Sequence, residues 1–167
     1  MKTELFSNFA ADMQKSTLTI KREFAAGRQL VWDCYTKAEL LDQWYAPKPL
    51  TAKTKSMDFR DGGHWHFAMV TPDGQEYWSR LDYLTISPID GYTALDGFTD
   101  ETGIVNLDLP RAHMDLTFTD AGSHTMMQTI VSYDSPEDLQ KVIDMGVEAG
   151  LASTLERLDE LLPTLAR

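Results

Sequence analysis

The sequence predicts an α+β domain in which a curved antiparallel β-sheet wraps around one long C-terminal α-helix, with two short helices after the first strand. Three observations support this fold class. Short segments of alternating apolar and polar residues succeed one another between residues 51 and 133. A helical pattern follows the first alternating segment, and a long amphipathic pattern occupies the last part of the chain. The length of 167 residues fits one domain with a substantial core.

The first 15 residues precede the alternating pattern and are expected to form an appendage to a domain that spans residues 16–165. Their large apolar residues fall at helical spacing: Leu5, Phe6, Phe9 and Met13. This spacing predicts one or two amphipathic helical turns. A helix this short needs a surface to pack on. That surface is either its own domain or a second copy of the chain in a homodimer, and the sequence leaves both open.

Residues 17–24 form the first predicted strand, because apolar and polar residues alternate along them. From residue 28 to residue 45 the apolar positions recur at helical spacing, with a break near Thr36. We therefore predict two short consecutive helices. Pro47 and Pro49 end the second helix, since proline removes a backbone donor and clashes with the preceding turn.

The middle of the chain predicts a run of strands joined by short turns. The clearest turns are Asp61-Gly62-Gly63 and Pro72-Asp73-Gly74. The predicted strands comprise residues 51–59, 64–71, 76–86, 92–98, 112–119 and 123–133. Consecutive strands with such short connections form an antiparallel meander.

A strong helix start introduces the last element. Ser135 is a preferred N-cap residue, Pro136 suits the first helical position, and Glu137 and Asp138 place acids in the first turn. An apolar stripe follows at Leu139, Val142, Ile143, Val147, Leu151, Leu155, Leu158 and Leu162. We predict one continuous helix of roughly 27 residues, about 40 Å long, which is enough to cover the apolar face of the sheet.

Composition narrows the classes of partner. The chain has 26 acidic and 15 basic residues, for a net charge of −11. This charge repels nucleic acids and anionic membranes, and we expect neither as a partner. No apolar run reaches the ~18 residues of a membrane span, and the N-terminus lacks the apolar run of a secretory signal. With the single cysteine, Cys34, expected to be a buried thiol, these features predict a cytoplasmic protein.

Aromatic and methionine residues on the predicted strands indicate an apolar cavity under the helix. Bulky rings and adaptable thioethers suit an irregular apolar site, although the same residues also suit a packed core. Gly146 and Gly150 each cost a helix interior roughly 1 kcal/mol, and they leave space on one helix face. The predicted ligand-binding residues are Trp44, Trp65, Phe67, Met69, Tyr83, Met114, Leu116, Phe118, Met127, Met145, Gly146 and Gly150.

Signals for catalysis or cofactor binding are weak. His64 and His66 are two residues apart, as metal ligands can be, but an exposed strand face is the favoured interpretation and we predict no metal site. The sequence has no nucleophile motif, phosphate-binding loop or dinucleotide fingerprint, so we predict neither a catalytic residue nor a cofactor. Glu76, Asp82 and Asp96 would be general bases only if they faced the cavity.

Four segments, in order, carry a resemblance to a known family. They are REFAA at 22–26 with VW at 31–32, ELLDQW at 39–44, DFRDGGHW at 58–65, and MGVEAGL at 145–151. Over residues 17–162 the chain resembles the heat-shock protein 90 ATPase activator-like family of the START-like, helix-grip superfamily. Many members carry Trp where Val147 stands and Pro near Gly27, and the first of these changes alters the volume over the cavity.

The resemblance implies a helix-grip domain with an apolar cavity between the sheet and the long helix. In related folds such cavities hold lipids, sterols, polyketides and other hydrophobic molecules. Binding of a small hydrophobic or amphipathic ligand, without defined catalysis, is therefore the leading hypothesis. The family name implies a chaperone-linked interaction module as one alternative. A cyclase-type or hydrolase-type enzyme that uses the same pocket is the other, and it needs a titratable pair inside the cavity.

Overall fold

A computed structural model describes residues 5–165 and places eight strands in one antiparallel sheet. The strand order across the sheet is β1-β2-β8-β7-β6-β5-β4-β3. The strands are β1 (Ser7–Asp12), β2 (Thr17–Phe24), β3 (Thr51–Asp58), β4 (His64–Val70), β5 (Glu76–Ser87), β6 (Gly91–Thr99), β7 (His113–Ala121) and β8 (His124–Ser132). The helices are α1 (Arg28–Thr36), α2 (Ala38–Leu41), α3 (Pro136–Asp144) and α4 (Val147–Leu165).

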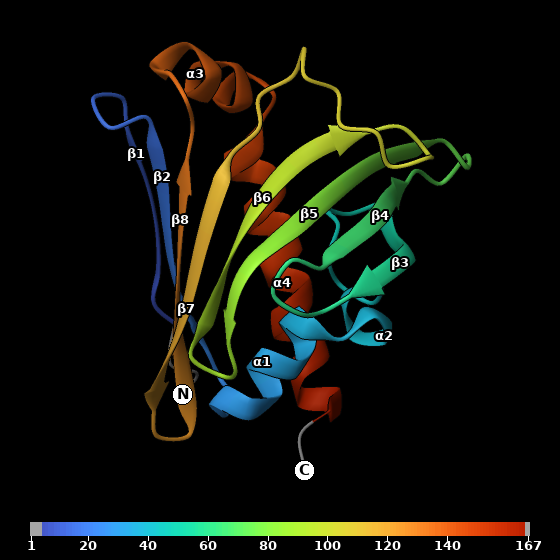
Figure 1. Cartoon of the computed structure of the whole chain (residues 1–167). Helices are drawn as coiled ribbons and strands as arrows, with labels where there is room; N and C mark the ends of the chain where they lie inside the picture. The colour runs from blue at the N-terminus through green and yellow to red at the C-terminus, as the bar shows by residue number, and fades with distance from the viewer. Residues whose placement is uncertain (1–4, 166–167) are drawn as a thin grey trace.

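The sheet curves around α4, which runs along its concave face (Figure 1). The helices α1 and α2 lie near one end of that face, and α3 lies at the opposite end (Figure 1). This arrangement confirms the predicted helix-grip fold: an α+β domain with a curved antiparallel sheet, a long C-terminal helix and two short helices after the predicted first strand. In the part of the chain that the structure describes, no helix has both the length and the apolar character that a membrane crossing needs.

The helical turns expected near the N-terminus are wrong. Residues 7–12 form β1, an edge strand that pairs antiparallel with β2, with Phe9 opposite Ile20. An isolated helix of so few residues is only marginally stable, whereas pairing with β2 satisfies the backbone groups of both strands. The Asp12 carboxylate accepts hydrogen bonds from the backbone N–H groups of Gln14 and Lys15, at 3.0 and 3.1 Å, and so closes the β1–β2 turn.

The C-terminal helix is divided, where one continuous helix was expected. The predicted N-cap is confirmed, since Ser135 Oγ accepts a hydrogen bond from the Asp138 N–H at 3.1 Å. However, α3 ends at Asp144 and α4 begins at Val147. Between them Gly146 has φ +87°, a left-handed conformation that glycine adopts without the penalty of a Cβ. Gly146 therefore lies at the break between two helices and not inside one.

Hydrogen bonds fix α4 against the segment that follows α2. The Arg157 guanidinium donates to the carbonyl oxygens of Ala46 and Leu50, at 2.8 and 2.6 Å. The Lys48 N–H donates to Ser153 Oγ at 3.0 Å. These bonds satisfy backbone carbonyls in a proline-containing segment that has no sheet partners of its own. They hold one flank of α4 in place over the sheet.

An ion pair fixes the other flank of α4. Arg22 on β2 pairs with Asp159 on α4, and Arg22 is almost completely buried. Burial raises the pKa of the Asp159 carboxyl, although Arg22 opposes this shift. Arg22 Nε and Asp159 Oδ1 have no hydrogen-bond partner among the described residues. The pair therefore joins α4 to β2 through opposite charges.

Candidate functional site

A cavity of about 360 Å³ lies between the concave face of the sheet and the helices α3 and α4. Both layers contribute to its wall. The lining residues are Ile20, Tyr35, Trp44, Tyr45, Pro47, Met69, Phe98, Met114, Leu116, Met127, Thr129, Val131, Val142, Met145, Val147, Gly150, Leu151, Thr154 and Leu155. Most of these side chains are apolar, and four are methionines.

The sheet side of the wall follows from strand alternation. Met114 and Leu116 on β7 are two residues apart and point to the same face, as do Met127 and Thr129 on β8. Phe98, at the end of β6, extends the wall. Three of these five side chains are flexible or small, so this wall is less rigid than one built from aromatic rings.

The helix side of the wall has a gap at Gly150. A Cβ placed on Gly150 would meet no atom within 4 Å, so the absent side chain leaves open space and does not relieve a close approach. Five residues earlier, at the α3–α4 junction, Met145 lines the same cavity while 56% of its surface is exposed. The cavity therefore reaches the protein surface at the junction of α3 and α4.

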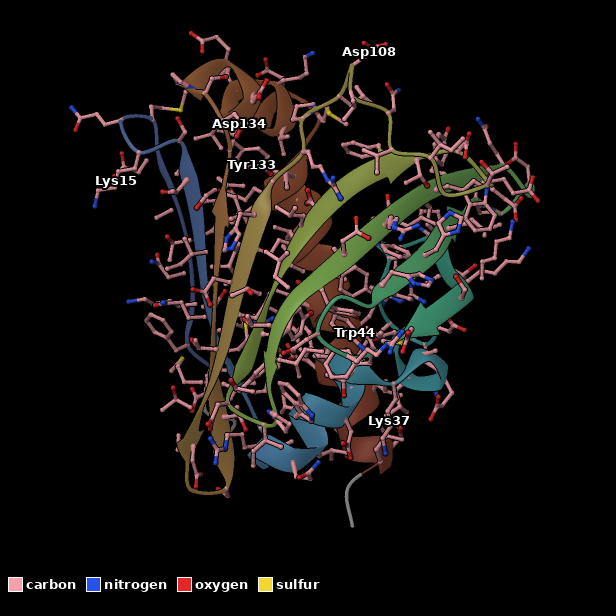
Figure 2. All side chains as sticks on the ribbon, viewed as in Figure 1. Lys15, Lys37, Trp44, Asp108, Tyr133 and Asp134 are labelled. Atoms are coloured by element: carbon pink, nitrogen blue, oxygen red, sulfur yellow. The ribbon has the colours of Figure 1, made fainter. Side chains whose placement is uncertain are left out.

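The loop that connects β6 to β7 lies at the same end of the molecule as α3. Asp108 marks the loop, and Asp134 precedes α3 (Figure 2). Phe98 and Met114, which flank the loop in sequence, both line the cavity. Within the loop Leu107 is exposed, and Met145 at the α3–α4 junction is exposed as well. Apolar side chains at this end are suited to the entry of an apolar molecule.

Four hydroxyl groups belong to residues of the wall, and two of them already donate hydrogen bonds. Thr129 Oγ1 donates to the Met127 sulfur at 2.9 Å, and Thr154 Oγ1 donates to the Gly150 carbonyl at 2.8 Å. The other two hydroxyls belong to Tyr35 and Tyr45. Burial raises the pKa of Tyr45 to about 12 and raises that of Tyr35 as well, so both remain protonated donors at neutral pH.

Asp96 is an acid on the concave side, just outside the cavity wall. It occupies the β6 face that also carries Ala94 and Phe98. Asp96 Oδ1 accepts a hydrogen bond from the Ala112 N–H at 2.8 Å. Burial raises the pKa of Asp96 to about 6, although this bond and Arg111 oppose the shift. Among the described residues that line the cavity itself there is no carboxylate, histidine or amine.

Seven of the twelve predicted ligand-binding residues line the cavity: Trp44, Met69, Met114, Leu116, Met127, Met145 and Gly150. Trp44 lies beside α2 (Figure 2), and its indole N–H donates to the Cys34 carbonyl at 3.0 Å. Cys34 itself is buried, as expected.

The remaining five predicted residues lie elsewhere. Trp65 and Phe67 stack on each other with ring centroids 3.8 Å apart, and Tyr83 and Phe118 are buried among aromatic rings. Gly146 lies at the break between the helices. These rings face the concave side as predicted, but neighbouring rings fill the space in front of them. The face of a strand follows from its alternation, whereas the depth of free space over each residue does not.

Sequence reasoning missed part of the wall, including Tyr35, Tyr45 and Phe98. Phe98 had a usable signal, because it continues the inward alternation of Ala94 and Asp96 on one strand. Tyr45 follows Trp44 directly and has no periodic signal that would place it. Its ring lies edge-on to Trp44, Trp65 and Phe67, and only long-range packing brings these rings together.

The expectation that His66 lies on an exposed face is wrong. His66 is only 4% exposed, and its ring nitrogen Nε2 lies 3.2 Å from both Thr99 Oγ1 and the Asp100 carbonyl. The loop after β6 covers it. His64 pairs with Ser56 instead, with 2.8 Å between His64 Nε2 and Ser56 Oγ. Within residues 5–165, no three His, Cys, Asp or Glu side chains gather as a metal site would require.

Two of the acids considered as bases belong to ion pairs. Glu76 pairs with Lys53 at 2.9 Å. Asp82 pairs with Arg80 at 2.7 Å and also with Arg111. Neither acid lines the cavity. Asp96 alone of the three lies on the concave face.

A second hollow of about 540 Å³ lies at the start of α1. Its largest apolar side chains are Leu30 and Ile89, and its rim includes Arg28, which pairs with Asp90 at 2.7 Å. Fewer large apolar groups means less favourable burial for an apolar ligand than in the cavity under α4. The cavity under α4 is therefore the candidate site.

Comparison with known proteins agrees with the fold. The model of the family described as activator of Hsp90 ATPase homolog 1-like protein matches residues 25–163. The crystal structure of protein Ms6760 from Mycobacterium smegmatis is 33% identical, with a TM-score of 0.86 over 95% of this chain and 97% of that one. No curated protein matched the sequence.

Two further solved structures extend the comparison. A solution structure of a protein from Arthrobacter aurescens is 28% identical, with a TM-score of 0.86 over 91% of this chain and 88% of that one. The AHSA1 protein from Silicibacter pomeroyi shares the fold at 20% identity, with a TM-score of 0.69 over 89% and 98% of the two chains. The similarity spans nearly the whole of each protein.

Proposed function

This chain belongs to the activator of Hsp90 ATPase homolog 1-like family, and we propose that its function is to bind a small apolar or amphipathic molecule in the cavity under α4. The observation that carries this proposal is the hollow at Gly150: about 360 Å³ of space, walled by apolar side chains and reaching the surface beside Met145. Its volume lies within the range of ligand sites, about 300–1,000 Å³.

Packing energetics favour an occupied cavity over a structural gap. Empty apolar volume destabilises a fold by roughly 24 cal/mol per Å³. Alanine at position 150 would also improve helix propensity by roughly 1 kcal/mol, and nothing in the fold obstructs its Cβ. Gly150 therefore lowers the stability of the fold in two ways: it leaves apolar volume empty and it weakens the helix. A bound apolar molecule offsets that loss, because burying apolar surface gains roughly 25 cal/mol per Å².

The wall also suits ligands of irregular shape. Met69, Met114, Met127 and Met145 come from three strands and the α3–α4 junction, so flexible thioethers face the cavity from several directions. Methionine adapts to different shapes at little cost in strain. A site of this kind holds molecules by shape and apolar contact, and the hydroxyl groups set their orientation.

A blocking variant tests the proposal. Native mass spectrometry of the purified protein detects a co-purified ligand, and titration with the neutral fluorescent probe N-phenyl-1-naphthylamine measures the affinity of the emptied site. We expect Gly150→Met to weaken probe binding at least tenfold, because its side chain fills the open space. Ala149→Met is the matched control, since Ala149 is exposed on the same helix. Equal binding by wild type and Gly150→Met would overturn the proposal.

A chaperone-linked role is the second candidate, favoured by the match of the family model to residues 25–163. The experiment adds the protein to purified heat-shock protein 90 and measures the ATPase rate. A rise in rate that persists in Gly150→Met would assign the activity to a surface, whereas a rate unchanged at micromolar protein would exclude the role.

A further inference from the structure

The hydrogen-bond donors that line the cavity limit which chemical classes of ligand it can bind. Among the described residues of the wall, polar hydrogens come from Thr129, Thr154, Trp44, Tyr35 and Tyr45. The first three already donate: the threonines to Met127 and Gly150, and the Trp44 indole to Cys34. In the described chain no hydrogen bond joins the Tyr35 or Tyr45 hydroxyl to another group. The two phenols are therefore the donors that remain for a ligand.

Trp44 packs against the rings of both tyrosines. The ring of Tyr35 lies edge-on to Trp44 with centroids 4.9 Å apart, and the ring of Tyr45 does the same at 5.1 Å. Burial is the main reason that the pKa of Tyr35 is raised, and the nearby Tyr45 raises it further, so the two hydroxyls lie near each other. Rings held in this way lose little freedom when their hydroxyls bind an acceptor.

Charge disfavours an anionic acceptor at this position. The described residues of the wall include no Lys, Arg or His. Burial raises the pKa of Tyr45 most, and the nearby Asp96 raises it further; above about pH 6 Asp96 is ionised. Among the residues that the structure describes, the one cation close enough to lower the pKa of Tyr35 is Arg22, and it is already paired with Asp159. A buried carboxylate ligand would therefore lack a free counter-ion here and would face a like charge at Asp96. A cation would find no carboxylate in the wall itself. A neutral oxygen acceptor meets neither penalty.

Resting on the ligand-binding function proposed above, we infer that the cavity selects neutral apolar molecules that carry a carbonyl-type oxygen, with the Tyr35 and Tyr45 hydroxyls as the donors to that oxygen. The hydroxyl hydrogens of Thr129 and Thr154 are already donated within the protein, so these residues contribute only to the shape of the cavity. Each phenol–carbonyl bond is worth about a three- to tenfold change in affinity.

Three probes of nearly equal size separate the contribution of the hydrogen bond to affinity from those of apolar burial and of charge. They are 2-decanone, its hydrocarbon isostere 2-methyl-1-decene, and the carboxylate nonanoate, each measured by displacement of N-phenyl-1-naphthylamine. In Tyr35→Phe and in Tyr45→Phe we expect the affinity for 2-decanone to fall about three- to tenfold. The affinity for 2-methyl-1-decene should stay unchanged, and it also reports that each variant has folded. In wild type, nonanoate should bind at least tenfold more weakly than 2-decanone.

Tyr83→Phe is the matched control. Tyr83 is buried on the same sheet face and its hydroxyl has no partner among the described residues, but it lies outside the wall. Removal of the Tyr83 hydroxyl should leave the ratio of ketone affinity to alkene affinity unchanged. Suppose that in both wall variants the affinities for the ketone and the alkene fall together, or that neither falls. The assignment of the donors is then wrong, and the binding function stands. Tight nonanoate binding would overturn the selection for neutral ligands. Failure of wild type to bind any probe would overturn both proposals.

Discussion

Near α1, Trp32 lies edge-on to Phe59, Tyr92 and Phe118, with ring centroids 5.7–6.3 Å apart. Toward α3, the same concave face carries methionines around open space. The two regions share one sheet and one helix. Along α4 the change is direct, since Leu158 and Leu162 are buried whereas Gly150 leaves a gap.

The difference indicates that the two regions of the core have different roles. Interlocked aromatic rings contribute apolar area and fixed geometry, so the α1 region is suited to holding the fold. Methionines, a glycine and a break in the helix give the α3 region space and adaptable shape at a cost in stability. If this is correct, substitutions in the two regions will differ in both size and sign.

The largest expected effect is in the packed region. Trp32→Ala removes a ring that contacts three others and should lower the free energy of unfolding by about 3–5 kcal/mol. Met114→Ala, on the cavity wall, should lower it by only about 1 kcal/mol, because that side chain is half-buried and already borders empty space. Urea denaturation of both variants gives the comparison. Equal losses would mean that the two regions are packed alike.

The next effect depends on pH and concerns Asp96. Its pKa is raised to about 6 in the fold, from 3.8, so the folded state holds the proton more tightly than the unfolded state. Its contribution to stability is therefore full at low pH and is lost as the pH rises through 6. Asp96→Asn keeps an acceptor for the Ala112 N–H without the charge. The variant should be about 1–2 kcal/mol more stable than wild type at pH 7.5 and nearly equal at pH 4. A difference independent of pH would contradict this account.

Gly146→Ala tests the break between the helices. A Cβ at φ +87° is strained, so the variant should lose about 1 kcal/mol in thermal or urea unfolding. Gly146→Asn should lose less, because asparagine tolerates the left-handed region better than alanine does. A stabilising alanine would mean that the helix runs on unbroken.

Gly150→Ala should have the smallest effect and the opposite sign. Its Cβ meets nothing within 4 Å and the residue is helical, so we expect a gain of about 0.5–1 kcal/mol. The reverse change at the adjacent exposed position, Ala149→Gly, should cost a similar amount. Loss of stability in Gly150→Ala would show that this part of the wall is closed.

Local sequence predicted most of the secondary structure, for reasons that the structure makes clear. The strand at Thr17–Phe24 and the helix start at Ser135 depend on neighbours a few residues away, through alternation and capping. The prediction was wrong where a distant partner decided the outcome. Residues 7–12 became a strand because β2 offered a free edge, and His66 was covered by a loop more than 30 residues later in the chain.

The sequence by itself determined which residues face the interior, because strand and helix periods depend only on the backbone. Trp65, Phe67 and Met69 therefore share one face in both prediction and structure. The tertiary structure alone decided that Trp65 and Phe67 stack while Met69 borders the cavity. The depth of free space over each residue depends on the curvature of the sheet and on where α4 lies. The Arg22–Asp159 pair and the Arg157 hydrogen bonds fix the position of α4. Each of these contacts joins residues that are more than 100 positions apart in the sequence.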